Sequence, residues 1–167
     1  MERAYKLEFA GEQAGSLYVS CCGLSKTEPL HSFGPAQKPY YLIHYILRGK
    51  GRFSLRNKEF QLSSGNGFLI PPEELSFYQA DEKEPWTYIW VGFQGESAER
   101  ILQNVGLTVT NPVFSSQCSE ELYQAVKDMM EHNTYGISND LRRNGQLQVF
   151  LSVIADGVTT QEHGEVD

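Results

Sequence analysis

The sequence has few cysteines and few basic residues. Only three cysteines occur in 167 residues, two of them adjacent at Cys21 and Cys22. An odd count without metal-type spacing predicts reduced, buried thiols rather than a disulfide framework. The 14 Lys and Arg are outnumbered by 21 Asp and Glu, which gives a net charge of -7 at pH 7. Because binding to phosphates requires clustered cations, this chain is not expected to grip DNA by itself.

Long apolar runs are absent from the sequence as well. No stretch reaches the roughly 18 apolar residues that a bilayer-spanning helix needs. The N-terminus lacks the apolar core of a secretory signal. Together with the reduced cysteines, these absences predict a cytoplasmic protein with no membrane partner.

Recognisable catalytic motifs are also missing. The sequence contains no phosphate-binding G-x-x-x-x-G-K-[ST], no G-x-S-x-G, no H-E-x-x-H and no C-x-x-C. Of its four histidines, only His31 and His44 fall in the β-rich part, and a metal site draws three or four ligands together. We therefore expect no metal, no other cofactor and no enzymatic activity. For His44, a hydrogen-bonded residue in the β-core or on a pocket wall is the simplest interpretation.

Residues 40–72 form a block with the pattern of short strands. Aromatic and β-branched runs alternate with glycine-rich or polar turns at about every 8–12 residues, which favours a β-sandwich or barrel. Within this block, the polar run Arg56-Asn57-Lys58 is typical of a hairpin. Residues 86–93 predict the last strong strand. Trp86, Tyr88 and Trp90 would share one of its faces, and Ile89 and Val91 the other.

After residue 94 the period changes to that of helices. We expect helices over 96–105, from Ser119 onward and from Ser138 to about 156, the last with apolar residues that include Leu141, Leu147, Leu151 and Ile154. The predicted organisation is an N-terminal arm with little structure of its own (1–16), a β-barrel (17–94), a helical part (95–156) and a polar linker or chain end (157–167). The helices either pack on the barrel or form a dimer interface, and the sequence favours neither.

Aromatic residues are dense in the β-rich part. Trp and Tyr suit polar, ring-shaped ligands such as sugars, because the C–H face of a sugar lies on the ring while phenol and indole groups hydrogen-bond its hydroxyls. Plain core packing is the alternative for any single aromatic. The pair Tyr88 and Trp90, next to a strand carrying Tyr78, is the best candidate for a pocket wall.

Three segments together resemble the N-terminal sensor domain of AraC/XylS-family transcription regulators, in the subgroup that controls sugar operons. They are HSFGP (31–35) followed by YYLIHYILRGKG (40–51), GNGFLIPP (65–72) and WTYIWVGFQG (86–95). The resemblance implies a cupin-like double-stranded β-helix, or jelly-roll, barrel that binds a small effector, often a sugar. It also implies a homodimer formed through helices after the barrel, and DNA binding by a C-terminal pair of helix-turn-helix units. No such pair follows residue 156, so DNA would be contacted only through a domain not in this chain.

The resemblance also assigns ligand positions. Tyr78 matches a ligand-contacting tyrosine, Trp90 a tryptophan that stacks on the sugar, and Tyr88 stands where the best-known arabinose-binding member has a histidine. His31, Tyr41 and His44 are further pocket candidates from the residues themselves. We expect dimerisation to involve Leu141, Leu147, Leu151 and Ile154.

The sequence therefore predicts the effector-sensing and dimerisation domain of such a regulator, with a sugar in the barrel. The alternative is a cupin-type sugar isomerase or another small-molecule enzyme. Metal cupins carry histidines and a glutamate at family positions that here hold Lys38, Leu42 and Ser76. The resemblance thus argues against a metal-dependent enzyme.

Overall fold

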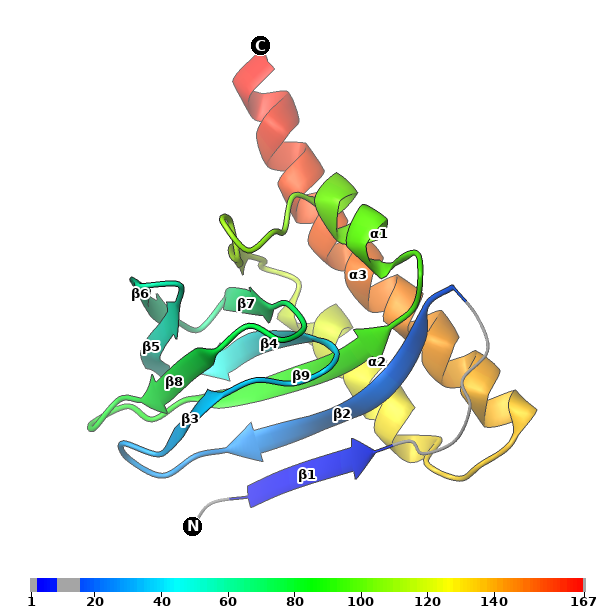
Figure 1. Cartoon of the computed structure of the whole chain (residues 1–167), viewed down its shortest axis with the longest axis horizontal. Coiled ribbons are helices and arrows are strands. Elements are labelled where there is room, and N and C mark those ends of the chain that lie inside the picture. The colour runs from blue at the N-terminus through cyan, green and yellow to red at the C-terminus, as the bar shows by residue number, and fades with distance from the viewer. Residues whose placement is uncertain (1–2, 9–15, 167) are drawn as a thin grey trace.

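The computed structural model describes residues 3–8 and 16–166 of the chain, with side chains for residues 16–157. These ranges contain ten β-strands and three α-helices (Figure 1). Nine strands come before the first helix, and the tenth lies between α1 and α2. The strands are β1 (Arg3–Glu8), β2 (Tyr18–Lys26), β3 (Ser32–Ala36), β4 (Tyr41–Arg48), β5 (Lys50–Leu55), β6 (Lys58–Ser63), β7 (Asn66–Ile70), β8 (Ser76–Ala80), β9 (Thr87–Gln94) and β10 (Val113–Ser115). The helices are α1 (Ala98–Val105), α2 (Ser119–Glu131) and α3 (Ile137–Val166). The predicted class, mainly β with C-terminal helices, is confirmed.

The strands form two antiparallel sheets that face each other. The larger sheet has the order β1-β2-β9-β4-β7-β10 and the smaller one β3-β8-β5-β6. Local sequence explains the hairpin connection between β5 and β6. Its two loop residues, Arg56 and Asn57, have φ angles of 47° and 64°, and a two-residue loop with both φ positive matches the twist of a hairpin. The polar hairpin predicted at this point is confirmed.

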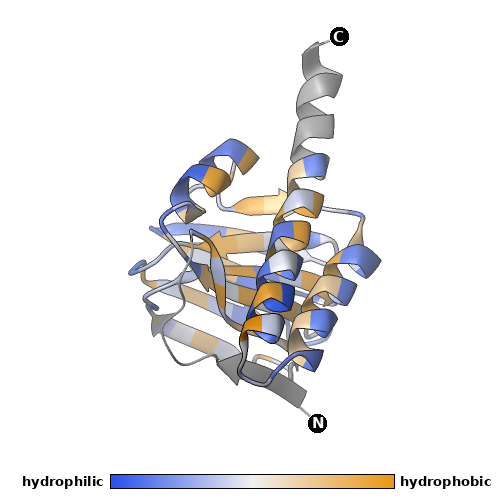
Figure 2. Ribbon diagram, turned by 90° about the vertical axis from the view of Figure 1, so that its right-hand side faces the viewer, coloured by the Kyte–Doolittle hydropathy of each residue, from blue (hydrophilic) through white to orange (hydrophobic). Residues whose placement is uncertain are grey.

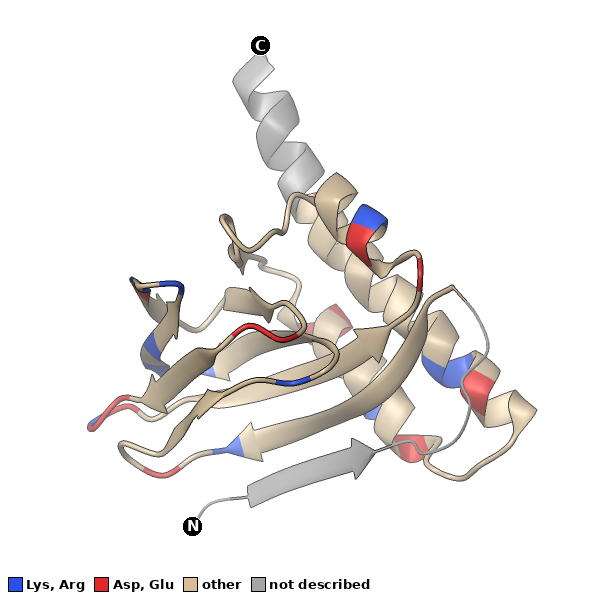
Figure 3. Ribbon diagram, viewed as in Figure 1, with Lys and Arg blue, Asp and Glu red and all other residues tan. Residues whose placement is uncertain are grey.

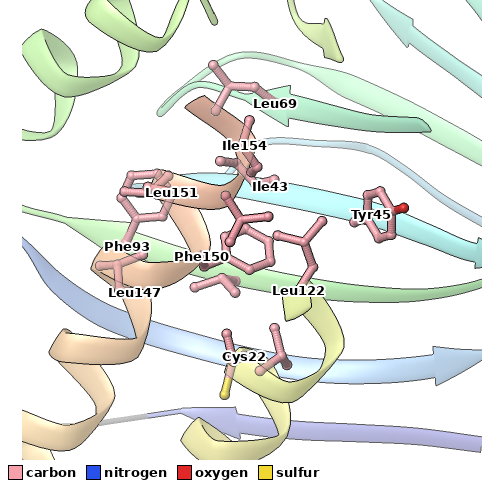
Figure 4. Close-up of a cluster of buried hydrophobic side chains, with 14 of the residues drawn as sticks. Cys22, Ile43, Tyr45, Leu69, Phe93, Leu122, Leu147, Phe150, Leu151 and Ile154 are labelled. Atoms are coloured by element: carbon pink, nitrogen blue, oxygen red, sulfur yellow. The ribbon is translucent and has the colours of Figure 1, made fainter. Parts of the chain in front are cut away.

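Two clusters of buried side chains hold the layers together. One fills the space between the sheets and includes Phe53, Phe68 and Trp86. The other lies between the larger sheet and the helices, and Figure 4 shows Phe93, Leu122 and Phe150 among its members. Helices α2 and α3 cover the outer face of the larger sheet (Figure 1) and turn their apolar sides toward it (Figure 2). The larger sheet is therefore buried on both faces.

The helix ends follow the signals in the sequence. Helix α1 stops at Gly106, whose φ of 97° is a left-handed conformation that glycine adopts without steric cost. Helix α2 carries Glu120 and Glu121 in its first turn, where the helix dipole favours acids. The buried Arg143 of α3 donates hydrogen bonds to the carbonyls of His132 and Thr134 and pairs with Asp140. This arginine satisfies carbonyls at the end of α2 and fixes the turn between the two helices.

Several boundaries differ from the sequence-based expectations. Residues 3–8, expected to have little regular structure, form β1 along the edge of β2. Helix α3 runs to Val166 instead of ending near residue 156. Each of these elements depends on a distant partner strand or helix that its own sequence does not reveal.

Lys and Arg positions (blue) and Asp and Glu positions (red) are both spread over several described elements in Figure 3. Basic residues of the smaller sheet have acidic neighbours, with ion pairs between Lys50 and Glu84 at 3.4 Å and between Arg52 and Glu59 at 3.5 Å. Among the described residues, no helix is both long enough and apolar enough to cross a membrane.

One hydrogen bond joins α3 to the far end of the larger sheet. The Val19 N–H donates to Asn144 Oδ1 at 3.0 Å, beside the irregularity in β2 between Val19 and Cys21. We expect Asn144→Ala to lower the free energy of unfolding by about 1 kcal/mol, because a partly buried N–H loses its acceptor. Urea unfolding measures this. Gln148→Ala, at an exposed site on the same helix, is the control, and an equal loss in both variants would contradict the assignment.

Candidate functional site

A cavity of about 180 Å³ lies between the two sheets. Its lining comes from strands β2, β4 and β9 of the larger sheet, from β3 and β8 of the smaller one, and from the segments flanking β3. The lining residues are Ser25, His31, Phe33, Lys38, Tyr40, Leu42, His44, Tyr78, Tyr88 and Trp90. Five of the six ligand-binding residues predicted from the sequence belong to this set, and Tyr41 does not.

Strand register brings the main side chains together. His44 on β4 is paired with Trp90 on β9, and Tyr88, two residues before Trp90, points to the same face. Across the cavity, Tyr78 on β8 is paired with Phe33 on β3. The face shared by Trp86, Tyr88 and Trp90, which the sequence predicted, is confirmed because all three lie in the cluster between the sheets.

Aromatic rings surround the His44 imidazole. Its ring stacks on Phe68 at 4.7 Å between centroids, with an interplanar angle of 6°. The rings of Tyr78 and Tyr88 approach it at 4.8 Å and 4.9 Å in tilted orientations. Trp90 lies at 6.4 Å. The imidazole is therefore enclosed by aromatic surface and is only 2% exposed.

The His44 ring carries a buried nitrogen, Nδ1, that has no hydrogen-bond partner in the described part of the chain. Leaving a buried polar group unpaired costs about 1–3 kcal/mol. Burial also lowers the pKa of His44 to about 3, because a charged imidazolium would lose its hydration. The side chain is thus neutral at pH 7, with one nitrogen that donates and one that accepts a hydrogen bond.

Tyr78, another residue that lines the cavity, is also neutral. Burial raises the pKa of the Tyr78 phenol well above its usual value, and the hydrogen bond that joins it to Tyr88 adds to the shift. Lys38 lies partly exposed, its Nζ 5.4 Å from the centroid of the Phe33 ring. Among the described residues that line the cavity, none is acidic. The site can therefore stack on a ring and exchange hydrogen bonds with neutral groups, and it offers no carboxylate to pair with a cation.

Tyr41 lies on the opposite face of β4. Its ring stacks on Phe93 at 5.6 Å and packs against the helix-side cluster. It lines a separate cavity of about 220 Å³, together with Glu99 of α1, and burial followed by the charge of Glu99 raises the pKa of its phenol. This corrects its sequence-based assignment to the pocket. Residues 41 and 44 differ by three, and an odd spacing in a strand puts side chains on opposite faces.

Larger hollows exist on the outside of the molecule, and in one of them the main charged groups are already paired. One of about 530 Å³ on the smaller sheet is lined by Lys50, Arg52 and Gln79 among others. Arg52 donates two hydrogen bonds to Gln79 Oε1 and pairs with Glu59. No group of three or more His, Cys, Asp or Glu in the described ranges is arranged to hold a metal ion. The aromatic cavity remains the candidate site.

Comparison with known proteins assigns the chain to a family. Residues 18–151 match the family described as the AraC-like ligand binding domain. The chain belongs to this family. It is 36% identical over 141 residues to the Msm operon regulatory protein of Streptococcus mutans, which covers 84% of this chain and 51% of that protein. It is also 46% identical over 54 residues to the raffinose operon transcriptional regulatory protein of Pediococcus pentosaceus, or 32% of this chain and 20% of that one.

These relatives are transcription regulators, and this AraC-like ligand binding domain spans about half the length of the Msm regulator. Among solved structures, it is similar to a cupin 2 conserved barrel domain protein from Salinispora arenicola. That likeness has a TM-score of 0.46 and 15% identity and covers 59% of this chain and 81% of the other.

The sequence-based predictions did not include some of the residues that line the cavity of this AraC-like ligand binding domain. They are Ser25, Phe33, Lys38, Tyr40 and Leu42. Even-numbered spacing from His44 could have identified Tyr40 and Leu42, because alternate residues of a strand share a face. Gly92 on β9 also makes room for Tyr40, since a Cβ atom there would lie 2.8 Å from Tyr40 Cε1. Lys38 and Phe33 carry no local signal in the sequence. Phe33 lies on the short strand β3, and Lys38 lies in the segment between β3 and β4.

The four residues predicted for dimerisation fall on two faces of α3. Leu147, Leu151 and Ile154 are at most 4% exposed and lie in the helix-side core, as Figure 4 shows. Leu141 is 64% exposed on the opposite side. This corrects the choice of the first three, because the larger sheet of the same chain already covers them.

The buried imidazole makes a pH-dependent contribution that can be tested. In the unfolded chain His44 takes up a proton near its ordinary pKa of about 6.5, whereas in the folded chain it stays neutral down to about 3. The free energy of unfolding therefore falls by about 2 kcal/mol between pH 7.5 and pH 5 because of this residue alone. We expect His44→Phe to remove that loss, because phenylalanine does not titrate.

Urea unfolding of both proteins at pH 7.5 and pH 5 measures the difference. Carboxylates elsewhere contribute equally to both proteins, and the raised pKa of Tyr78 keeps it neutral throughout this range. The same loss of stability in wild type and His44→Phe would show that His44 is not buried in neutral form.

Proposed function

We propose that this chain is the effector-sensing and dimerisation part of a cytoplasmic regulator of a sugar-utilisation operon. A neutral sugar would bind in the cavity between the sheets and act as a signal rather than as a substrate. DNA would be bound by a helix-turn-helix part of the protein outside this chain. The names of the Msm and raffinose operon regulators, and the share of their length that this chain spans, support this function.

The observation that carries the proposal is the chemistry of the cavity. Trp90, Tyr88 and Tyr78 supply ring faces and phenol groups, and His44 and Ser25 add neutral polar groups. Apolar ring faces match the C–H faces of a pyranose, while convergent hydroxyl and imidazole groups match its hydroxyls. The lack of acidic lining residues in the described part of the cavity suits a neutral ligand.

Strands β4 and β9 can couple ligand binding in the cavity to the placement of the helices. His44 and Trp90 line the cavity, and their neighbours Ile43 and Val91, which are paired across the same two strands, belong to the helix-side core. A ligand that favours one placement of these strands would also favour one placement of the helices. This is a shift between populations of pre-existing states, driven by the ligand's difference in affinity for them.

A second copy of this chain is the proposed partner of α3. The exposed apolar residues near its start are Tyr135, Ile137 and Leu141, with Val149 two turns further on. Ile137, Leu141 and Val149 are spaced by multiples of four, so they follow one side of the helix. That side is opposite to the one that packs on the sheet. We propose that Leu141 and these neighbours form the dimer contact.

Replacing the tryptophan tests the site. We expect Trp90→Ala to weaken sugar binding at least tenfold, about 1.4 kcal/mol, because the stacking surface is lost. Binding is measured by calorimetry after a thermal-shift screen of neutral mono-, di- and trisaccharides that includes raffinose. A bound ligand at a hundredfold excess over Kd stabilises the folded chain by about 2.7 kcal/mol.

Tyr41→Ala is the matched control for the tryptophan variant, because Tyr41 lies on the other face of β4 and lines a different cavity. It should leave the affinity unchanged. A chain in which no saccharide raises the melting temperature, or in which Trp90→Ala binds as tightly as wild type, would refute the proposed sugar site.

The dimer contact is tested by placing a charge on the outer side of α3. Leu141→Lys should weaken self-association at least tenfold in sedimentation velocity, because it would bury an unpaired ammonium at the contact. Leu75→Lys is the control, since Leu75 is 59% exposed in the loop before β8, away from α3. A wild-type chain that is monomeric at tens of micromolar would contradict the proposed dimer.

A further inference from the structure

The His44 ring is unusual among the buried polar groups of this chain. It lies at the centre of the larger sheet, paired with Phe68 on β7 and with Trp90 on β9. Its Nδ1 is the one buried side-chain nitrogen or oxygen without a hydrogen-bond partner among the described residues. Buried polar atoms in proteins are nearly always paired, and an exception calls for an explanation.

The surroundings of His44 supply no partner of their own. The rings that enclose it are those of Phe68, Tyr78, Tyr88 and Trp90. Tyr78 and Tyr88 hydrogen-bond to each other. The open side of His44 is the cavity, which it lines. An atom that fills this unmet hydrogen bond would come from the cavity, either from a water molecule or from a ligand that displaces it.

We propose that His44 determines the specificity of the effector site by exchanging a hydrogen bond with a hydroxyl group of the sugar at the deep end of the cavity. The inference rests on the proposed function and adds which residue of the protein recognises the ligand. A hydroxyl can donate as well as accept, so it suits either tautomer of a neutral imidazole. A sugar without that hydroxyl would leave the buried nitrogen unpaired, and sites built in this way reject such analogues strongly.

The size of the cavity limits what His44 can contact. At about 180 Å³ it falls below the roughly 300–1,000 Å³ of pockets for drug-sized ligands. It therefore admits one six-membered ring. Phe33, 38% exposed, and the partly exposed Lys38 are at the outer end of the lining, whereas His44 is 2% exposed. A longer saccharide would insert one terminal ring and extend outward past Phe33, so His44 would read the inserted ring alone.

The test uses His44→Phe and a set of single-hydroxyl deletions. The probes are D-glucose, D-galactose, their methyl glycosides and the monodeoxy forms of each, with raffinose as the extended sugar. The phenyl ring keeps the stack on Phe68 and removes the unpaired nitrogen. We expect folding stability at pH 7.5 equal to or above that of wild type, together with an affinity for the preferred sugar lower by roughly 10- to 100-fold.

The deoxy series separates a direct contact from a general change of shape. In wild type, one monodeoxy analogue should bind at least tenfold more weakly than its parent sugar. In His44→Phe that analogue and its parent should bind equally, because the contact that distinguished them is gone. Tyr41→Phe, altered on the opposite face of the same strand, should keep the discrimination of wild type.

Two results would overturn the role of His44 while leaving the sugar site intact. One is a wild-type chain that binds every monodeoxy form as tightly as the parent sugar, which needs no variant to fold. The other is a folded His44→Phe that keeps both the affinity and the discrimination. If His44→Phe fails to fold, His44→Gln replaces it in the same series. A wild-type chain that binds none of the probes would instead refute the proposed function and this inference with it.

Discussion

The alternation of side chains along β4 and β9 is the constraint on which the rest of the structure depends. Successive residues of a strand point to opposite faces, and in this chain both faces of the central pair are buried. Ile43, Tyr45 and Val91 pack under the helices, whereas Leu42, Ile46 and Trp90 face the smaller sheet. A shift of register by one residue in either strand would exchange the two sets, which would send His44 into the helix-side core.

This arrangement also explains why a polar residue is tolerated in the middle of the sheet. The helix side of the sheet buries its own apolar cluster, which includes Phe93, Phe150 and Leu122 and adds hydrophobic stabilisation that does not involve the cavity side. The cavity side can therefore contain both a small cavity and an imidazole whose nitrogen has no hydrogen-bond partner among the described residues. Binding sites commonly reduce stability in this way, because the groups that await a ligand are not used for packing.

The fold class and most of the site could be predicted from local patterns. The period-two alternation over residues 86–93 identified Tyr88 and Trp90 as neighbours on one face, and the polar Arg56-Asn57 pair marked the β5–β6 hairpin. Tyr41 was misplaced because the strand around it is apolar on both sides, so that its pattern does not distinguish the faces. Tyr78 was also named from the sequence, but its strand was expected beside that of Tyr88 and Trp90, whereas β8 lies in the smaller sheet across the cavity, which no local pattern contains.

The sequence by itself determined most of the strands and where the helices begin, the absence of recognisable catalytic motifs and the aromatic character of the pocket, because these depend on residues close together in the chain. The tertiary structure decided what depends on distant residues. It selected Leu147, Leu151 and Ile154 as the buried side of α3 and left Leu141 exposed, and it joined Val19 to Asn144, which are 125 residues apart. It also enclosed His44 among rings from β7, β8 and β9 without a hydrogen-bond partner among the described residues. An amphipathic pattern indicates that a side chain will be buried, but only the packed structure defines which groups surround it.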